Sequence, residues 1–284
     1  MITQEDIRAK ISNIPSIPHV VTQVLDICEN PDSDMGDIVD TLKLDEAITL
    51  KVLNLCNSSY YGLNRNVDSL QDAIVYLGLN TLINLVLTTV ASDYYRNSQT
   101  NYGLDRGELW KHSVAVAITA QIVGYHVRHE NSDRLFTSGL LHDIGKTVLD
   151  EYLTDNIELL REKIEQSGYT LLQAEEEVLG LTHCTVGEMI AEQWELSNSI
   201  RSVIANHHDP LNAEDYTLDC CICHLANGVV STMGIGVGAS FGMANDMQAE
   251  ALLYAKMPRQ KLFSLSAEFI ENYQKALALV KLDA

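Results

Sequence analysis

The chain has 284 residues, 46% of them hydrophobic, which is enough to bury a core in one large or two modest domains. Its formal net charge is −20, and it has no lysine- and arginine-rich run that could neutralise nucleic-acid phosphates or dock on an anionic membrane. No apolar stretch of roughly 18 residues occurs, and the polar N-terminus does not resemble a signal peptide. With six cysteines suited to a reduced state, we expect a cytoplasmic protein without nucleic-acid or membrane partners.

Helical periodicity dominates the first third of the chain. Apolar residues recur three or four positions apart over residues 20–28 and again over 48–56, as amphipathic helices require. Thr3, with acids at positions 5 and 6, predicts the start of a first helix, and residues 30–34 predict a loop that leads into another. Ser69, with Asp72 three residues later, predicts a further N-cap. No region alternates as a strand would, so the predicted fold is all-α.

The polar stretch 97–103 interrupts this pattern and predicts a boundary between two parts. We expect an N-terminal helical module over residues 1–98 and a second helical module over 104–284, packed closely because no proline-rich linker separates them. In the second module we expect a long buried helix over 113–127, with His112 at its start. The next helix, over 135–149, is expected to carry His142 and Asp143 into the core.

His142 and Asp143 are adjacent in the sequence Leu-Leu-His-Asp-Ile-Gly-Lys. An imidazole and a carboxylate can bind one metal ion, and the carboxylate can bridge to a second ion about 3.5–4 Å away. Burying this pair without a metal would be costly. Taken alone the pair is a weak signal. It is accompanied by further nitrogen and oxygen ligands in a set without thiolate, which suits iron, manganese or magnesium better than structural zinc. These further candidates are Glu108, His112, His183, His207 and His208.

Each of these further candidates also has a plain structural alternative. Glu108 and His112, four residues apart, could form an exposed ion pair on a helix. His183 could be a capping or core histidine, and the doublet 207–208 could be the solvated end of a helix before Pro210. Only their joint order favours a metal site over separate structural roles.

That order is Glu-x-x-x-His, His-Asp-x-Gly-Lys, a single histidine and a histidine doublet. It resembles the HD superfamily of metal-dependent phosphohydrolases, which includes the HD-GYP cyclic-dinucleotide phosphodiesterases. Segments 14–18, 44–47, 52–62 and 72–78 look like the signature of the HDOD family, the HD-related output domain of bacterial signalling proteins. The resemblance spans nearly the whole chain. It implies an HDOD-specific module packed on an HD-type helical bundle.

The resemblance also implies roles for individual residues. Asp143 would bridge the metals, and Lys146 would contact a substrate phosphate, where its ammonium would offset developing charge. The position of the last HD ligand, normally aspartate, is Asn227, whose amide oxygen can coordinate but brings no charge. Asp219 is a poor substitute, since eight residues of helix place it about 12 Å away. The implied metal ligands are Glu108, His112, His142, Asp143, His183, His207, His208 and Asn227.

The Gly-Tyr-Pro motif that should follow the histidine doublet is missing, because residues 211–216 read Leu-Asn-Ala-Glu-Asp-Tyr. Cyclic di-GMP hydrolysis is therefore not implied. Two functions remain open: a signalling output domain that acts on a protein partner and retains a two-metal site, or an active phosphohydrolase on a nucleotide or other phosphoester. Two divalent ions are expected, with iron or manganese favoured and magnesium or zinc as alternatives.

Two other motifs favour packing over chemistry. Residues 220–223 contain one Cys-x-x-Cys in a helical context without a second pair, which predicts core cysteines instead of a redox or zinc site. The glycines between 234 and 242 follow a predicted helix and lack a Gly-Lys-Ser/Thr motif, so they predict a turning loop, not a phosphate cradle.

Overall fold

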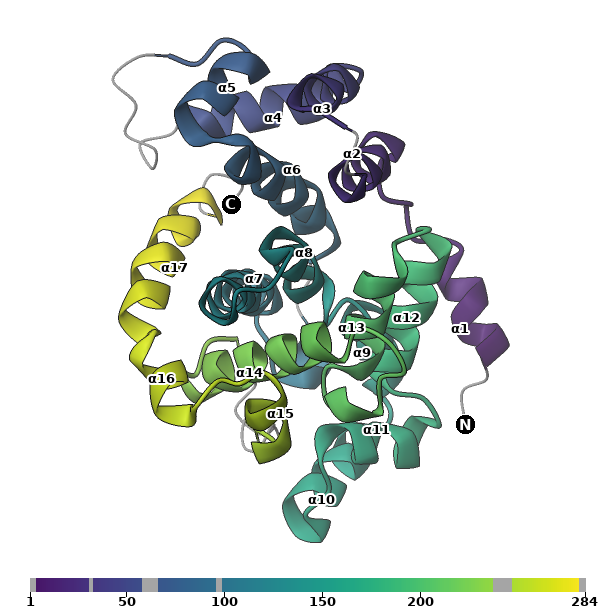
Figure 1. The fold of residues 1–284 in the computed structure, drawn as a ribbon. Coiled ribbons are helices and arrows are strands. Elements are labelled where there is room, and N and C mark those ends of the chain that lie inside the picture. Colours follow the sequence, from purple (N-terminus) through teal and green to yellow (C-terminus); the bar gives the residue numbers. More distant parts are fainter. Residues whose placement is uncertain (1–3, 31–32, 58–65, 96–98, 237–246, 281–284) are drawn as a thin grey trace. The chain divides into compact units, whose positions relative to one another are not determined.

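The structure is a computed structural model that describes residues 4–30, 33–57, 66–95, 99–236 and 247–280 (Figure 1). Throughout these ranges the regular elements are helices, and the described residues form no strand. One isolated β-bridge joins Gln99 to Leu104. The all-α fold predicted from periodicity is therefore confirmed.

The chain separates into two compact units. One contains residues 16–93 together with the end of the last helix, and the other contains residues 94–273 together with the N-terminal helix. The predicted division into an N-terminal module over residues 1–98 and a second module over 104–284 stays a prediction.

The smaller unit is built from helices whose apolar faces meet in a common core. Val21, Val24, Leu42 and Val52 are fully buried in it, or nearly so. Its helices are α2 (His19–Glu29), α3 (Met35–Leu42), α4 (Glu46–Cys56), α5 (Leu70–Leu77) and α6 (Leu79–Tyr94).

The predicted helix starts in this unit are confirmed where the structure describes them. The Asp34 side chain accepts from the backbone amide of Asp37 at the start of α3, and the Asp37 side chain accepts from the Asp34 amide, forming a capping box. The Ser69 hydroxyl caps α5 by accepting from the Asp72 amide at 3.0 Å. The cap predicted at Thr3 lies outside the described residues.

Among the described helices, none alone is long and apolar enough to cross a bilayer, although α5 and α6 pass that test as a pair bent by 118°.

The larger unit carries every residue predicted for the metal site. Its elements are α1 (Gln4–Ile11), η1 (Thr100–Tyr102), α7 (Glu108–Val127), α8 (Ser132–Leu141), α9 (Lys146–Leu153), α10 (Ile157–Ser167), α11 (Leu171–Leu179), α12 (His183–Gln193), α13 (Asn198–Asn206), η2 (Pro210–Asn212), α14 (Thr217–Thr232), α15 (Ala249–Tyr254), α16 (Arg259–Ser264) and the first part of α17 (Ser266–Val280).

Helix α7 lies at the centre of this unit, beside α8 and α14 (Figure 1). It begins at Glu108, five residues before the predicted start, because Gly107 has a left-handed φ of 80° and a helix cannot run through it. His112 therefore lies one turn inside the helix. Small side chains let α8 approach closely: a Cβ at Gly139 would lie 2.9 Å from the Cα of Ala117.

The single helix predicted over residues 135–149 is wrong. Helix α8 ends at Leu141, residues 142–145 form a turn, and α9 begins at Lys146. Gly145 allows this turn to pack on the start of α12, since a Cβ there would overlap the carbonyl oxygen of His183 and lie 2.7 Å from the amide nitrogen of Gly187. The break places the His-Asp pair at a helix junction that faces α12.

Candidate metal centre

His142 and Asp143 are both fully buried. Nδ1 of His142 donates to the Gly139 carbonyl oxygen at 2.7 Å, which directs Nε2 toward the Asp143 carboxylate, 3.4 Å from its Oδ2. Burial lowers the pKa of His142 well below its usual range, so the ring is neutral near pH 7 and Nε2 carries a lone pair. This buried Nε2 has no hydrogen-bond partner.

Asp143 is surrounded by nitrogen atoms from several helices. Its Oδ1 lies 3.3 Å from Nε2 of His183 and 3.7 Å from Nε2 of His207, yet it has no hydrogen-bond partner. Its Oδ2 accepts from Nζ of Lys146 at 2.7 Å. Although burial raises the pKa of Asp143, attraction by the surrounding cationic groups, chiefly Lys146, outweighs it and holds that pKa well below its usual range. The carboxylate is therefore charged and offers a free lone pair.

His112 and Asn227 approach the carboxylate from α7 and α14. Nδ1 of His112 lies 2.9 Å from the Ile235 carbonyl oxygen, and Nε2 lies 3.1 Å from Oδ1 of Asn227 and 3.7 Å from Oδ2 of Asp143. Burial lowers the pKa of His112, so its neutral ring has one proton, which Nδ1 donates to Ile235. In this orientation of the Asn227 amide, the Nε2 lone pair meets two oxygen acceptors, an arrangement that a shared cation would stabilise.

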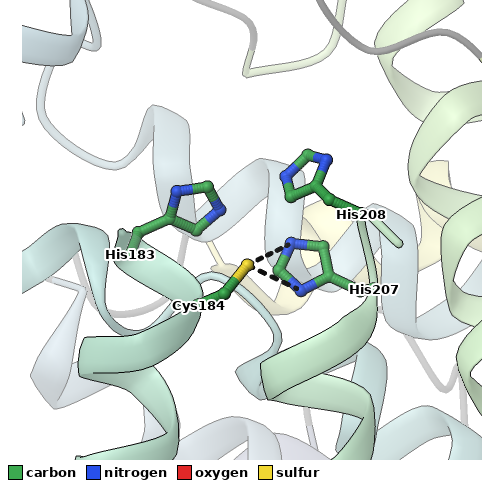
Figure 2. A group of neighbouring side chains, drawn as sticks. All are labelled: His183, Cys184, His207 and His208. Carbon is green, nitrogen blue, oxygen red and sulfur yellow. Dashed lines mark hydrogen bonds between the residues drawn. The ribbon is translucent and has the colours of Figure 1, made fainter. Parts of the chain in front are cut away.

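The other face of the cluster comes from α12 and the end of α13 (Figure 2). The His208 ring centroid lies 5.1 Å from that of His183 and 4.3 Å from that of His207. Nε2 of His183 and Nε2 of His208 are buried without hydrogen-bond partners. His207 is fully buried, so the alternative of a solvated helix end does not apply to it.

Cys184 adds a sulfur atom that the sequence did not single out. Its Sγ lies 3.8 Å from Nδ1 and 4.0 Å from Nε2 of His207 (Figure 2). Although burial raises the pKa of this thiol, attraction by His207 and His183 lowers it to about 6. No sequence signal distinguishes this cysteine from a packing residue, because its role depends on which helix packs opposite.

Glu175 on α11 is a second residue that sequence reasoning missed. It is fully buried, and Oε2 accepts from Nδ1 of His183 at 2.8 Å and from the His183 amide at 2.9 Å. The Tyr102 hydroxyl donates to Oε1 at 2.7 Å. Burial lowers the pKa of His183, but attraction by Glu175 outweighs it and raises that pKa to about 10. In the sequence Glu175 is one of three consecutive glutamates, and nothing there marks it as the buried one.

Glu108 lies apart from these contacts. Its side chain is 34% exposed and accepts from Nζ of Lys111 at 2.5 Å. It belongs to neither of the two groups of close ligand atoms found among the described residues, so its role as a ligand stays a prediction. Each group has all its ligand atoms within 4.8 Å of one another: His183, Cys184, His207 and His208 form one, and His112, His142 and Asp143 form the other.

Asp219 and the cysteines of α14 lie outside both groups. Asp219 accepts from Arg134 at 2.9 Å and contacts Nε2 of His129 at 2.8 Å, joining the starts of α8 and α14. Cys220 and Cys223 are fully buried in α14, and the six cysteines form no disulfide. Their position is that of core residues.

The donor set fits a divalent metal ion. Buried polar atoms are rarely left without partners, since each costs about 1–3 kcal/mol. Here four such atoms converge on one region, and one metal ion or two would satisfy them all if the ion replaces the proton that the raised pKa keeps on His183. These atoms are Nε2 of His142, Oδ1 of Asp143, Nε2 of His183 and Nε2 of His208.

Together, the all-helical fold and the buried histidine-aspartate cluster define a helical protein with a candidate metal centre. The HDOD domain matches residues 14–210 of this sequence, which is more than half of the chain. The chain belongs to the HDOD family.

Its relatives include an uncharacterized protein of Treponema pallidum (strain Nichols), 24% identical over 212 residues. That match covers 73% of this chain and 40% of the relative, so the chain spans less than half of the relative's length.

Solved structures share the fold at low sequence identity. An HDOD domain protein of unknown function from Geobacter sulfurreducens has a TM-score of 0.69 at 24% identity, covering 98% of this chain and 92% of that one. A candidate phosphohydrolase from Shewanella amazonensis SB2B has a TM-score of 0.72 at 21% identity and covers 98% of both chains. A candidate signal transduction protein from Marinobacter aquaeolei VT8 has a TM-score of 0.77 at 19% identity, covering 98% of this chain and 61% of that one.

Proposed function

We propose that this protein is a signalling output domain of HDOD type whose buried cluster binds divalent metal. The observation that carries the proposal is the convergence of four buried, unpartnered donor atoms around Asp143. If this region served only for packing, apolar side chains would fill the same volume without the free-energy cost of burying unpartnered polar atoms.

The geometry favours one ion on each side of Asp143. On one side, Oδ1 faces His183 and His207, with His208 beside them. On the other side, Oδ2 lies near Nε2 of both His112 and His142. Asn227 would complete the second position through its amide oxygen, and Glu108 could join it only by giving up its ion pair with Lys111.

The output role requires a partner, which we propose to be another signalling protein. Family membership supports this role. The uncharged Asn227, at a position where the resemblance implies aspartate, favours a site that binds metal without demanding catalysis.

Lys146 favours a second candidate function, that of a metal-dependent phosphohydrolase on a nucleotide or other phosphoester. When bound, divalent ions polarise a phosphoryl oxygen and lower the pKa of a bound water. Nζ of Lys146, held 2.7 Å from Oδ2 of Asp143, would then offset charge on a substrate phosphate. Asp143 would bind the metal ions, and Lys146 would orient the phosphoester.

Metal analysis of the purified full chain tests the proposed site. We expect roughly two equivalents of divalent metal, and His142→Ala should remove most of it. His126→Ala is the matched control, since this histidine lies on α7 but contacts Glu268 at the surface, with Nε2 3.1 Å from Oε2. Metal-free protein from metal-replete medium, with no uptake on later addition, would refute the proposal.

A screen of phosphodiester and nucleotide substrates separates the two functions. Turnover that Asp143→Ala and Lys146→Ala both abolish, with metal still bound in the lysine variant, would establish the hydrolase. Absence of turnover with iron, manganese, magnesium and zinc in turn would leave the output domain as the function.

A further inference from the structure

Cys184 brings a sulfur atom to the cluster from the same helix start as His183 (Figure 2). The two are the first residues of α12, and both side chains extend toward the histidine doublet. Cys184 is 4% exposed, and its ligand atom lies within 4.8 Å of those of the three histidines around it. We propose that Cys184 is a thiolate ligand of a metal ion held by His183, His207 and His208.

The open nitrogen atoms of these histidines point to such an ion. Nδ1 of His183 is occupied by Glu175, and Nδ1 of His207 donates to the Ile204 carbonyl oxygen at 3.0 Å. Nε2 of His183 and Nε2 of His208 have no hydrogen-bond partner. In each of these rings Nε2 is the nitrogen left for a metal ion, and on His183 the ion would replace the proton that the raised pKa keeps there.

The separation between Cys184 and His207 is close to that of two ligands on one metal ion. Zinc bonds of about 2.3 Å to sulfur and about 2.0–2.1 Å to nitrogen place two such ligand atoms roughly 3.5 Å apart. Sγ of Cys184 and Nε2 of His207 are 4.0 Å apart, so a small side-chain rotation brings them to that separation. On coordination the thiol loses its proton to solvent and the sulfur forms the metal bond.

A sulfur ligand changes the metal that this side of the centre should prefer. Thiolate with imidazole favours zinc, cobalt(II) or iron(II), whereas magnesium and manganese prefer oxygen. The expectation of iron or manganese drawn from nitrogen and oxygen ligands would then apply only to the side formed by His112, His142 and Asp143. This inference rests on the proposed metal site and adds a ligand and a metal preference to it.

Cobalt(II) is the probe that reports sulfur ligation directly. We would strip the full chain with a chelator, load it with cobalt(II), and record its absorption spectrum. We expect a thiolate-to-cobalt charge-transfer band in the near ultraviolet. Cys184→Ser should lose this band and bind cobalt roughly 10-fold more weakly or worse in competition with a chelator. Cys221→Ser is the matched control and should keep the band, since Cys221 is equally buried but belongs to neither ligand group.

The outcomes separate this inference from the proposed function. Bound cobalt without a charge-transfer band, or a band that persists in Cys184→Ser, would overturn the cysteine ligand and leave the metal site standing. Failure of the wild-type chain to bind any cobalt or zinc would overturn both. If Cys184→Ser does not fold, X-ray absorption of the zinc-loaded wild type decides: a sulfur at about 2.3 Å supports the ligand, and a shell of nitrogen and oxygen alone overturns it.

Discussion

Glu175 holds His183 through two hydrogen bonds, one to Nδ1 at 2.8 Å and one to the backbone amide at 2.9 Å. Both residues are fully buried, and the contact turns Nε2 of His183 toward Asp143, 3.3 Å away. A carboxylate on the far nitrogen of a histidine sets its tautomer and increases the basicity of the nitrogen that faces a metal. Tyr102 in turn positions Glu175 through its hydroxyl.

Glu175→Gln should weaken metal binding by about 10- to 100-fold, because the amide cannot supply the charge that orients and polarises His183. Competition between the protein and a chelator for zinc measures the change. Glu176→Gln, one residue away and exposed, should bind zinc as the wild type does. Equal affinities in the two variants would contradict a positioning role for Glu175.

Gly145→Ala should cost about 1–3 kcal/mol or more of the free energy of unfolding and also weaken metal binding. The added Cβ would overlap the carbonyl oxygen of His183 and push the turn away from α12. Urea unfolding and zinc competition measure the two effects. Gly168→Ala, at a left-handed φ of 69° with open space around it, should cost about 1–2 kcal/mol without changing zinc affinity. A Gly145→Ala protein with unaltered metal binding would show that the turn does not set the position of His183.

Asn227→Asp should increase metal affinity by about 10-fold or more, since it adds a negative charge beside Nε2 of His112. Without metal the same substitution should lower stability, because Asn227 is 3% exposed and the new charge would be buried. Calorimetric titration with manganese measures the change in metal affinity, and thermal unfolding in a chelator measures the change in stability without metal. Asn206→Asp, on α13 near the protein surface, serves as the control. An unchanged or lower affinity would remove Asn227 from the proposed ligands.

The thiols other than Cys184 should differ sharply in reactivity. Burial raises the pKa of Cys56 and of Cys221 to about 11 and that of Cys220 to about 12. The thiolate is the reactive form of cysteine. At pH 8 the thiolate fraction of these buried cysteines is about a thousandfold below that of a half-ionised thiol, and it increases as the pH rises toward 11. Iodoacetamide at pH 8 should therefore modify the exposed Cys28 first, as peptide mapping would detect. Equally fast labelling of Cys220 would contradict its burial, and urea-unfolded protein provides the fully labelled reference.

Sequence reasoning succeeded where a property is carried by neighbouring residues. Periodicity predicted helices, and Ser69 predicted its own cap because that contact spans three residues. Segments 14–18, 44–47, 52–62 and 72–78 indicated the HDOD family, and the HDOD match over residues 14–210 confirms it. The same reasoning failed over residues 135–149, where local propensity favours one helix and packing of Gly145 on His183 imposes a turn.

The helices, the family and the choice of histidines around Asp143 follow from the sequence, because each depends on residue types at short or regular spacing. The positions of Glu175 and Cys184 became evident only in the tertiary structure. Glu175 differs from the two glutamates that follow it only in facing His183, and Cys184 differs from five other cysteines only in facing His207. Which side chain faces a site depends on the long-range packing of α11, α12 and α13, and local sequence carries no record of that packing.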